Sequence, residues 1–369
     1  MKNFYKIFVI NPGTTSTKLA LFQDENKIYE TNVFHEASEL LSYPTVNAQL
    51  PYRKKVILDF LQEEKIDLSD VDAIVGRGGS CYPVSGGVYE VDDLLLEDTK
   101  ACRGGMEHPS NLGIQLGVEL QREYGGRVFM LDPIATDELC DEARMTGIYG
   151  LNRHVNLHTL NCRGIAMKYA KSLGKQYSEM RLIVAHIDGG ITISAHCDGK
   201  IIDCNDSGGG DGPYTPTRVG SVSVADLIDY CQGKTPEELH KLCNRTGGFV
   251  SHFGTNDASK VHNLVEQGNP HAVRVWNGMI YQVNKYIGAL AAVLEGKVDA
   301  ICLTGGLLRY PDLVENIRSH CGWIAPIALF PGEVEHEAMA AGALRVLRGE
   351  ELPRKYSGHP VWEGWPDEK

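Results

Sequence analysis

The sequence predicts an α/β protein with two similar lobes, and three observations support this prediction. Residues 6–34 and residues 182–204 both have the pattern of three consecutive strands, and a glycine-containing turn joins the first two strands of each segment. Helical periodicity alternates with short apolar runs in the regions that follow. The chain has 369 residues and 43% apolar composition, which is more than one hydrophobic core usually needs.

The first half of the chain alternates between strand and helix patterns. Apolar, β-branched runs predict strands over residues 6–11, 18–23, 27–34, 71–75 and 127–131. Helices are predicted over residues 51–65 and 111–124, and Gly125 ends the second of them. The residues expected on one face of the first helix are Tyr52, Val56, Phe60 and Leu61.

The second half repeats this architecture. Residues 182–204 read as strand, glycine turn, strand, Asp198-Gly199 turn and strand. A helix is expected after Thr235, because Glu238 three residues later completes a capping box. The remaining expected elements are a helix over 271–294, a strand over 298–303, a turn over 304–306, and helices over 312–320 and 334–347.

Composition disfavours several classes of function. The net charge is 36 − 48 = −12, so sequence-independent binding to nucleic acid or to a membrane is not expected. No apolar run approaches the ~20 residues of a membrane span, and the run near the N-terminus is too short for a signal peptide. The ten cysteines are scattered without a Cys-x-x-Cys pair, which is typical of reduced thiols in a cytoplasmic protein. His154 and His158 have the spacing of a zinc-protease helix, but Val155 stands where that motif needs Glu, so we interpret them as a pair on a helix face.

The stretch VINPGTTSTKLALF, residues 9–22, resembles a P-loop only superficially. Lys18 follows Gly13 by five residues, but the second glycine is missing and Leu19 stands where a P-loop has Ser or Thr. Because the stretch joins two predicted antiparallel strands, we interpret it as a hairpin turn whose amides and hydroxyls bind phosphate. The direction of Lys18 depends on the strand register, which the sequence leaves open.

The second lobe has a corresponding turn at Gly189 and Gly190, and His186 before it could donate to a phosphate. Two such turns would present backbone N–H groups to a phosphate chain in a cleft between the lobes. The alternative is that these are ordinary hairpin glycines.

Two arginines stand beside glycine-rich segments. Arg77 precedes Gly78 and Gly79 at the end of a predicted strand, where a substrate could approach the backbone. Arg218 lies in SGGGDGPYTPTRVGS, residues 207–221, which is too rich in Gly and Pro for a regular element. We interpret this segment as an ordered functional loop that leads into a helix. A surface arginine in a turn and a plain linker are the alternatives.

Three other residues are candidates for chemistry. Asp132 ends a strand, and its position before proline predicts an extended backbone at a cleft rim, with a turn-capping role as the alternative. His158 lies near a helix start, where the amide dipole favours an anion over an imidazolium. Glu337 could hold Mg²⁺ through water, although Glu333 and Glu335 compete for that role and a solvated acidic run is the alternative.

Several stretches together resemble the acetokinase family, and within it the branch of butyrate kinases and branched-chain carboxylic acid kinases. The matching stretches are VINPGTTSTKLALF, VGRGGS, EHPSNLG, VFMLDPIATDEL, LHTLN, VAHIDGGITISAH, SGGGDGPYTPTRVGS, LTGGLLRY and GALRVLRGEE. They extend from residue 7 to about residue 351, so the resemblance covers nearly the whole chain.

The resemblance implies a fold of two ribonuclease-H-like domains, as in actin-like ATPases, with a central nucleotide cleft. It places residues 1–153 and 338–369 in the N-terminal domain and residues 154–337 in the C-terminal domain, which would carry nucleotide and dimer contacts. It also implies a homodimer or higher homo-oligomer, ATP or ADP as cofactor, and Mg²⁺.

The resemblance also implies roles for individual residues. Arg77 and Arg218 would hold the carboxylate and the transferring phosphoryl group, and Asp132 and His158 would be catalytic. Glu337 would be the metal-linked glutamate, together with Asn11. The residues that would bind the cofactor are Asn11, Gly13, Thr14, Thr15, Ser16, His186, Asp188, Gly189, Gly190, Gly208, Gly209, Gly210, Thr304, Gly305 and Gly306. Two departures, Leu157 where Phe is expected and Cys162 where Gln is expected, leave the shape of the acyl pocket open.

The implied reaction is carboxylate + ATP ⇌ acyl phosphate + ADP, with a short-chain acid such as butyrate or isobutyrate. A carboxylate is already ionised at pH 7, so the obstacle is electrostatic, and two arginines with Mg²⁺ would overcome it in a direct in-line transfer. Acetate or propionate is the nearest alternative substrate. A sugar or polyol kinase, with Asp132 or Asp188 as base, is the alternative within the fold. A non-catalytic ATPase module is the alternative outside enzymes.

Overall fold

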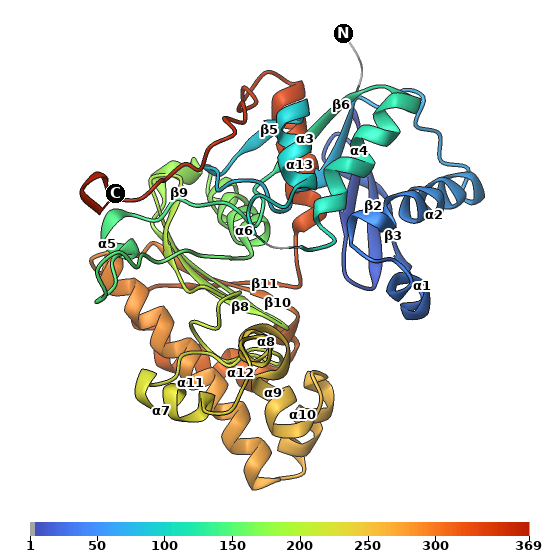
Figure 1. Ribbon diagram of the computed structural model, residues 1–369. Coiled ribbons are helices and arrows are strands. Elements are labelled where there is room, and N and C mark those ends of the chain that lie inside the picture. Colours follow the sequence, from blue (N-terminus) through green and yellow to red (C-terminus); the bar gives the residue numbers. More distant parts are fainter. Residues whose placement is uncertain (1–3, 106, 369) are drawn as a thin grey trace. The chain divides into compact units, whose positions relative to one another are not determined.

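The computed structural model describes residues 4–105 and 107–368, and the chain divides into two compact units. Unit 1 comprises the residues up to Asp137 and those from Val334 onward, and unit 2 comprises Glu138–Glu333. The sequence-based domain boundaries, at 153/154 and 337/338, differ from these and stay a prediction. Each unit contains one sheet with helices packed on it, which confirms the predicted α/β class (Figure 1).

The sheet of unit 1 has the strand order β3-β2-β1-β4-β6-β5 (Figure 1). Its strands are β1 (Lys6–Pro12), β2 (Ser16–Gln23), β3 (Asn26–Phe34), β4 (Ala73–Arg77), β5 (Val88–Glu90) and β6 (Arg127–Leu131). Its helices are α1 (Ala37–Leu41), α2 (Leu50–Glu63), α3 (Asp93–Lys100), α4 (Asn111–Tyr124) and α13 (Glu335–Leu347), with short 3₁₀ turns at Asn47–Gln49 and Pro366–Glu368. Strands β1, β4 and β6 are parallel, whereas β2, β3 and β5 pair in the antiparallel sense.

Helices cover both faces of this sheet. Met130 packs in a cluster with Ile114 of α4, whereas the neighbouring Leu131 lies against Gly342 of α13. Because successive side chains of a strand point to opposite faces, α4 and α13 lie on opposite faces of the sheet. Helix α13 belongs to unit 1 although it comes from the end of the chain.

Helix α4 approaches β4 unusually closely. A Cβ on Gly76 would lie 2.3 Å from the carbonyl carbon of Gly113, and a Cβ on Gly113 would lie 2.3 Å from the carbonyl oxygen of Arg77. Only two glycines allow this backbone contact. The contact fixes the end of β4, and with it the position from which Arg77 projects.

The sheet of unit 2 has the strand order β11-β10-β7-β8-β9. Its strands are β7 (Leu182–Ile187), β8 (Ile191–Cys197), β9 (Lys200–Cys204), β10 (Ala300–Gly305) and β11 (Ile327–Pro331). Its helices are α5 (Asp141–Arg144), α6 (Thr159–Ser172), α7 (Val224–Cys231), α8 (Pro236–Lys241), α9 (Gly248–Phe253), α10 (Ala258–Glu266), α11 (Pro270–Val293) and α12 (Pro311–Cys321). Short helical turns lie at Tyr177–Glu179, Leu242–Thr246 and Gly306–Arg309.

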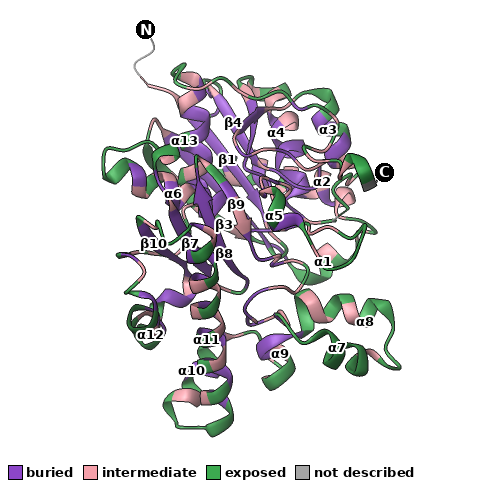
Figure 2. Cartoon of the chain, turned by 90° about the vertical axis from the view of Figure 1, so that its left-hand side faces the viewer, coloured by how far each residue is buried: buried purple, intermediate pink, exposed green. Residues whose placement is uncertain are grey.

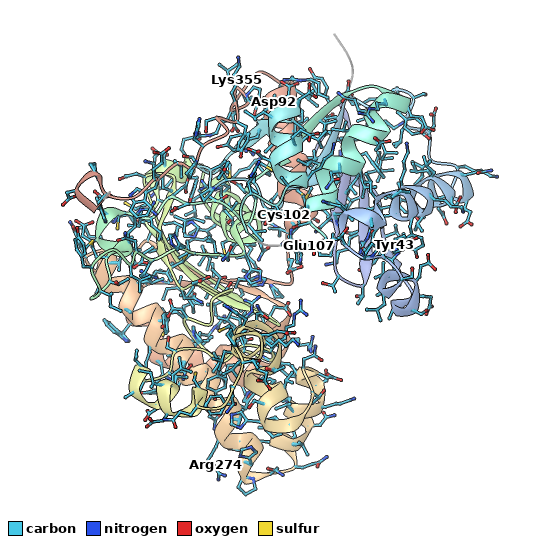
Figure 3. The ribbon with its side chains drawn as sticks, viewed as in Figure 1. Tyr43, Asp92, Cys102, Glu107, Arg274 and Lys355 are labelled. Carbon is cyan, nitrogen blue, oxygen red and sulfur yellow. The ribbon has the colours of Figure 1, made fainter. Side chains whose placement is uncertain are left out.

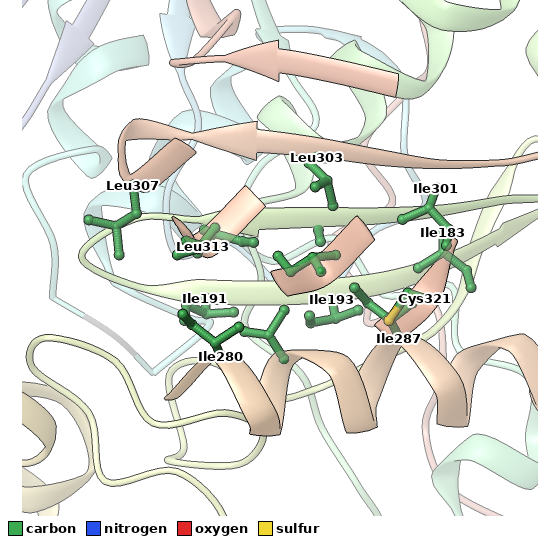
Figure 4. Close-up of a cluster of buried hydrophobic side chains, with 14 of the residues drawn as sticks. Ile183, Ile191, Ile193, Ile280, Ile287, Ile301, Leu303, Leu307, Leu313 and Cys321 are labelled. Atoms are coloured by element: carbon green, nitrogen blue, oxygen red, sulfur yellow. The ribbon is translucent and has the colours of Figure 1, made fainter. Parts of the chain in front are cut away.

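The core of unit 2 lies between this sheet and helices α11 and α12. Ile183 and Ile193 of the sheet pack with Ile280 and Ile287 of α11 and with Leu313 of α12 (Figure 4). Figure 2 shows the contrast between the buried strands and the exposed helices α7 and α8, which contribute no buried side chain. Among the described residues, no helix combines the length and apolar character needed to cross a bilayer.

The predicted repeat is confirmed. The order β3-β2-β1-β4 in unit 1 corresponds to β9-β8-β7-β10 in unit 2, and in each case two antiparallel pairings are followed by a parallel strand. The predicted helix over 111–124 and strand over 127–131 match α4 and β6. The capping box at Thr235 and Glu238 is present at the start of α8.

Two local predictions are wrong. On α2, Leu61 is buried as predicted, but Tyr52, Val56 and Phe60 are only partly buried. The other buried residues of this helix are Arg53 and Ile57, and apolar periodicity overlooks Arg53 because it is a cation. His154 and His158 do not share a helix face. Both precede α6, which begins at Thr159, and His158 is the N-cap residue.

Candidate active site

The turn between β1 and β2 is the first predicted phosphate turn. Gly13 closes it with a hydrogen bond from its amide to the carbonyl oxygen of Ser16 (2.7 Å). Thr14 and Thr15 at its tip are exposed, and within the described part of the chain their amides donate to no protein acceptor. Lys18 pairs directly opposite Asn11 in the hairpin, and residues opposite one another project from the same face of a sheet. The open question about the direction of Lys18 is thereby answered: it shares the face of Asn11.

A polar cluster of unit 1 contains Asn11, Arg77 and Glu335. The Asn11 amide donates to Glu335 Oε2 (2.7 Å), and Arg77 donates to Asn11 Oδ1 (3.2 Å). The Arg77 guanidinium also contacts both oxygens of Glu335, at 3.0 Å each. Asn11 is 3% exposed and Glu335 is 6% exposed, so the cluster combines a buried carboxylate with a guanidinium and an amide.

The structure places Glu335, and not Glu337, beside Asn11. Glu337 is exposed on α13, and its carboxylate accepts from Lys27 Nζ (2.8 Å). The two glutamates are two positions apart on a helix, so they point in different directions. The contact with Asn11 is therefore made by Glu335, which competed with Glu337 in the sequence, and the metal-linked role of Glu337 stays a prediction.

Asp132 does not have the extended backbone expected before a proline. Its φ is +39°, in the left-handed region, which Asp adopts more readily than most residues. Two hydrogen bonds with Gly87 hold it there: Oδ1 accepts from the Gly87 amide (2.7 Å), and its own amide donates to the Gly87 carbonyl (3.2 Å). Such strain is uncommon outside functional sites, and the side chain is 5% exposed.

His108 is a candidate that the sequence analysis assigned no role, although it lies in the matching stretch EHPSNLG. Its Nδ1 accepts from the Ser110 amide (3.1 Å), which leaves the proton of the neutral ring on Nε2. Burial, together with the charges of Arg77 and Arg53, lowers the pKa of His108 to about 4. The segment is anchored by Asn111, whose amide donates to Cys102 Sγ (3.1 Å; Cys102 is labelled in Figure 3).

The second predicted phosphate turn joins β7 and β8 in unit 2. The Asp188 carboxylate accepts from the Gly189 amide (2.8 Å) and from the Gly306 amide (2.6 Å). Asp188 therefore ties this turn to the turn over residues 304–306, which is also predicted to bind the cofactor. Both carboxylate oxygens have backbone donors, which favours a positioning role for Asp188 over that of a general base.

The loop over residues 207–221 folds onto this turn. The hydroxyls of Thr215 and Thr217 donate to the Gly189 carbonyl, at 2.8 Å and 3.3 Å. The Arg218 guanidinium lies against Gly190 so closely that a Cβ there would be 2.3 Å from Nη1. The segment is thus an ordered loop that leads into α7, as predicted.

Arg218 is a partly buried cation without a bonded acid. In the part of the chain that the structure describes, its Nε and Nη1 atoms are buried and make no hydrogen bond. Burial lowers the pKa of Arg218 from its usual value, and the Asp206 carboxylate partly opposes this shift. The three glycines Gly208, Gly209 and Gly210 lie in the turn after Asp206, which accepts from the Gly208 amide (3.2 Å). Unpaired guanidinium donors beside a phosphate turn are suited to bind an anion.

His158 and His186 are brought together in unit 2. Their rings stack with centroids 4.2 Å apart. His158 Nδ1 lies 2.8 Å from Thr192 Oγ1, and His186 Nδ1 lies 2.9 Å from the Asn161 side-chain nitrogen. Asn161 also donates to Thr304 Oγ1 (3.2 Å), so the network reaches the predicted cofactor turn over residues 304–306.

The described residues contain no group of three or more His, Cys, Asp and Glu arranged to hold a metal ion. This does not conflict with Mg²⁺, which proteins usually bind through one or two carboxylates, water and substrate phosphates. Glu335, with the Asn11 side chain beside it, has the chemistry for such a site.

Comparisons with known proteins agree with this architecture. A model of the acetokinase family matches residues 146–316. Two relatives, each named probable butyrate kinase and from the Alaska E43 and Eklund 17B strains of Clostridium botulinum, are 42% identical over 354 residues, covering 95% of this chain and 99% of theirs.

Solved structures show the same fold. Porphyromonas gingivalis acetate kinase has a TM-score of 0.76 at 18% identity, covering 93% of this chain and 100% of that one. A Francisella tularensis propionate kinase has a TM-score of 0.71 at 20% identity, covering 92% and 98%. These likenesses confirm the predicted actin-like ATPase fold.

Proposed function

Because the chain belongs to the acetokinase family, we propose that it transfers phosphate from ATP to a short-chain carboxylate, giving acyl phosphate and ADP in a reversible reaction. The observation that carries the proposal is Arg218, whose buried Nε and Nη1 have no protein partner among the described residues and lie beside the second phosphate turn. The relatives named probable butyrate kinase favour butyrate, or a branched acid of similar size, as the substrate.

The chemistry needs charge neutralisation more than base catalysis. The acid is ionised at neutral pH, so its oxygen can attack the γ-phosphorus without losing a proton. Arg77 and Arg218 would counter the charges of the carboxylate and the transferring phosphoryl group, which permits direct in-line transfer without a phosphoenzyme. Asp132 is held rigidly by Gly87, and we assign it and His158 to orienting the reacting groups.

We propose that backbone N–H groups bind the phosphates of the nucleotide. The exposed amides of Thr14 and Thr15 support a phosphate contact at the first turn, with Gly13 and Ser16 shaping it. The proposed contacts of unit 2 are His186, Asp188, Gly189 and Gly190 for the phosphates, Gly208, Gly209 and Gly210 in the adjoining loop, and Thr304, Gly305 and Gly306 for the adenosine.

Glu335 and Asn11 would hold Mg²⁺, through water and the phosphates. The ion, when bound, would supply further positive charge to the phosphate oxygens. Arg77 links this pair to the acid-binding part of the site, because it already contacts both residues.

We further propose a homodimer or higher homo-oligomer that acts in the cytoplasm. Helix α7 buries none of its side chains and exposes Val224 (72%) and Ile228 (62%), an apolar face that suits a second copy of the chain. All ten cysteines are unpaired thiols, which is typical of a reducing compartment. Light scattering of the protein, and of a Val224→Ser/Ile228→Ser double variant, tests the assembly.

A hydroxylamine trap tests the reaction. The protein is incubated with ATP, Mg²⁺ and a panel of linear and branched acids of two to six carbons, because acyl phosphates form hydroxamates and sugar phosphates do not. We expect hydroxamate with butyrate or isobutyrate at a higher kcat/KM than with acetate. ADP release with glycerol or a sugar, without hydroxamate from any acid, would instead establish a polyol or sugar kinase.

A further inference from the structure

Arg53 of α2 lies fully buried behind the first phosphate turn. Its side chain is 0% exposed, and it is among the largest fully buried side chains of the protein. Nη2 donates to the Gly13 carbonyl (3.0 Å), and Nη1 donates to the Ser16 carbonyl (3.3 Å) and to Thr17 Oγ1 (3.0 Å). Nε donates to Gln49 Oε1 (3.1 Å). Three of these four bonds therefore end on the turn itself.

Every acceptor of Arg53 is electrically neutral. Two are backbone carbonyls, one is a hydroxyl and one is a side-chain amide, and the described residues offer it no carboxylate partner. Burial lowers the pKa of Arg53 to about 10, which still leaves it protonated at neutral pH. Charged groups buried in proteins are normally paired, so an unneutralised cation beneath a ligand turn calls for a functional explanation.

The contacts of Arg53 also orient the turn. Because the carbonyls of Gly13 and Ser16 point inward to the guanidinium, the acceptors of the turn are occupied, whereas the amides of Thr14 and Thr15 lie at the exposed tip. His35 supports the same turn, since its Nε2 lies 2.8 Å from Thr17 Oγ1 and its amide donates to the Thr15 carbonyl (2.9 Å). Burial and the Arg53 charge lower the pKa of His35 to about 4, so this ring is neutral at pH 7.

We infer that Arg53 is a positioning residue for the nucleotide phosphates: it holds the turn with its amides outward and adds a permanent positive charge behind them. The inference rests on the proposed function in one respect, namely that the ligand of the turn is a nucleotide phosphate. Arg53 does not touch the phosphate. It acts through the turn and through its field, which is strong because no acid or solvent screens the buried charge.

A substitution at Gln49 distinguishes this electrostatic role of Arg53 from a solely structural role, because the two roles predict different effects on phosphate binding. Gln49→Glu keeps the shape of the acceptor and the hydrogen bond from Nε, but places a carboxylate against the guanidinium. If Arg53 only braces the turn, the new ion pair leaves phosphate binding intact. If its charge assists the phosphates, the same substitution weakens their binding while the fold is preserved.

The experiment measures binding by calorimetry to the full chain. The ligands are the non-hydrolysable adenosine 5′-(β,γ-imido)triphosphate with Mg²⁺ and, as the uncharged reference, adenosine. For Gln49→Glu we expect affinity for the triphosphate to fall about tenfold, with adenosine binding and the melting temperature unchanged. Thr17→Val, which removes one bond to Arg53 but keeps its charge, should lose less than threefold, and Arg53→Lys should retain more triphosphate affinity than Arg53→Gln.

Other outcomes are equally decisive. Triphosphate affinity of a folded Gln49→Glu protein within twofold of the parent would overturn the inference, as would an equal loss for triphosphate and adenosine. The comparison does not depend on the Arg53 variants, should they fail to fold. If the parent protein forms no hydroxamate but binds the triphosphate, the proposed reaction falls while the inference about Arg53 is still tested.

Discussion

Replacement of Arg218 by glutamine is the sharpest test of the proposed site. The side chain has two buried nitrogens, Nε and Nη1, that make no hydrogen bond among the described residues, so two donors are available to an anion. A hydrogen bond to a charged group contributes about 1.5–3 kcal/mol, and two of them contribute about 3–6 kcal/mol to the transition state. Since each 1.36 kcal/mol is a factor of ten in rate, Arg218→Gln should lower kcat by about 10²–10⁴.

Stability should move differently from activity. Removing a partly buried cation that has no bonded acid should leave the melting temperature unchanged or raise it. Arg153→Gln is the matched control, because Arg153 bonds to Asp203 (3.1 Å) and to the Cys204 carbonyl (2.7 Å) and should lose stability but keep kcat. Hydroxamate kinetics and thermal melts of both variants measure this. An Arg218→Gln enzyme with kcat within threefold of the parent would refute the reasoning.

Three further predictions follow from the site and the core. Glu335→Gln should lower kcat/KM at least about 100-fold, whereas Glu337→Gln stays within twofold; equal effects in hydroxamate kinetics would remove Glu335 from the metal site. Gly190→Ala places a Cβ 2.3 Å from the Arg218 guanidinium, so it should lower kcat more than tenfold with little change in melting temperature. Full activity of this variant would show that the position of Arg218 against Gly190 does not matter for the reaction. Burial lowers the pKa of His196 to about 3, so the unfolded chain binds the extra proton first and stability falls as pH drops from about 6.5 toward 3. His196→Gln should remove about 4–5 kcal/mol of that loss in acid denaturation curves, and an unchanged curve would argue against it.

The fold was predictable because its signals are local. The two hairpins, the helix over 111–124 and the capping box at Thr235 each depend on neighbouring residues, so pattern and structure agree. The face of α2 was mispredicted for the opposite reason. Its position 53 carries an arginine, and what buries that side chain is the set of acceptors on the β1–β2 turn, which no periodicity of apolar residues reveals.

The sequence indicated which types of residue belong to the candidate site, but not which of several similar residues contact one another. Arg77 and Arg218 were proposed as site residues because glycines lie near them in the sequence, and in the structure Gly190 leaves room for the Arg218 guanidinium. The sequence could not show which glutamate contacts Asn11, because three acidic residues within five positions are equivalent in the sequence. Helical geometry decides which of them turns inward to Asn11.

By itself the sequence determined the class of fold, the repeated hairpin and the glycine-containing turn in each hairpin, since these follow from propensity, glycine placement and strand alternation within short segments. Only the tertiary structure decided which distant groups meet. Asn11 and Glu335 are 324 positions apart, and they meet because α13 packs on the sheet that begins with β1. Likewise, the charge of Arg53 is buried and unpaired only once α2 has folded against that hairpin. A carboxylate or guanidinium acquires its chemical role from the solvent it loses and the partners it gains, and both are properties of the folded chain.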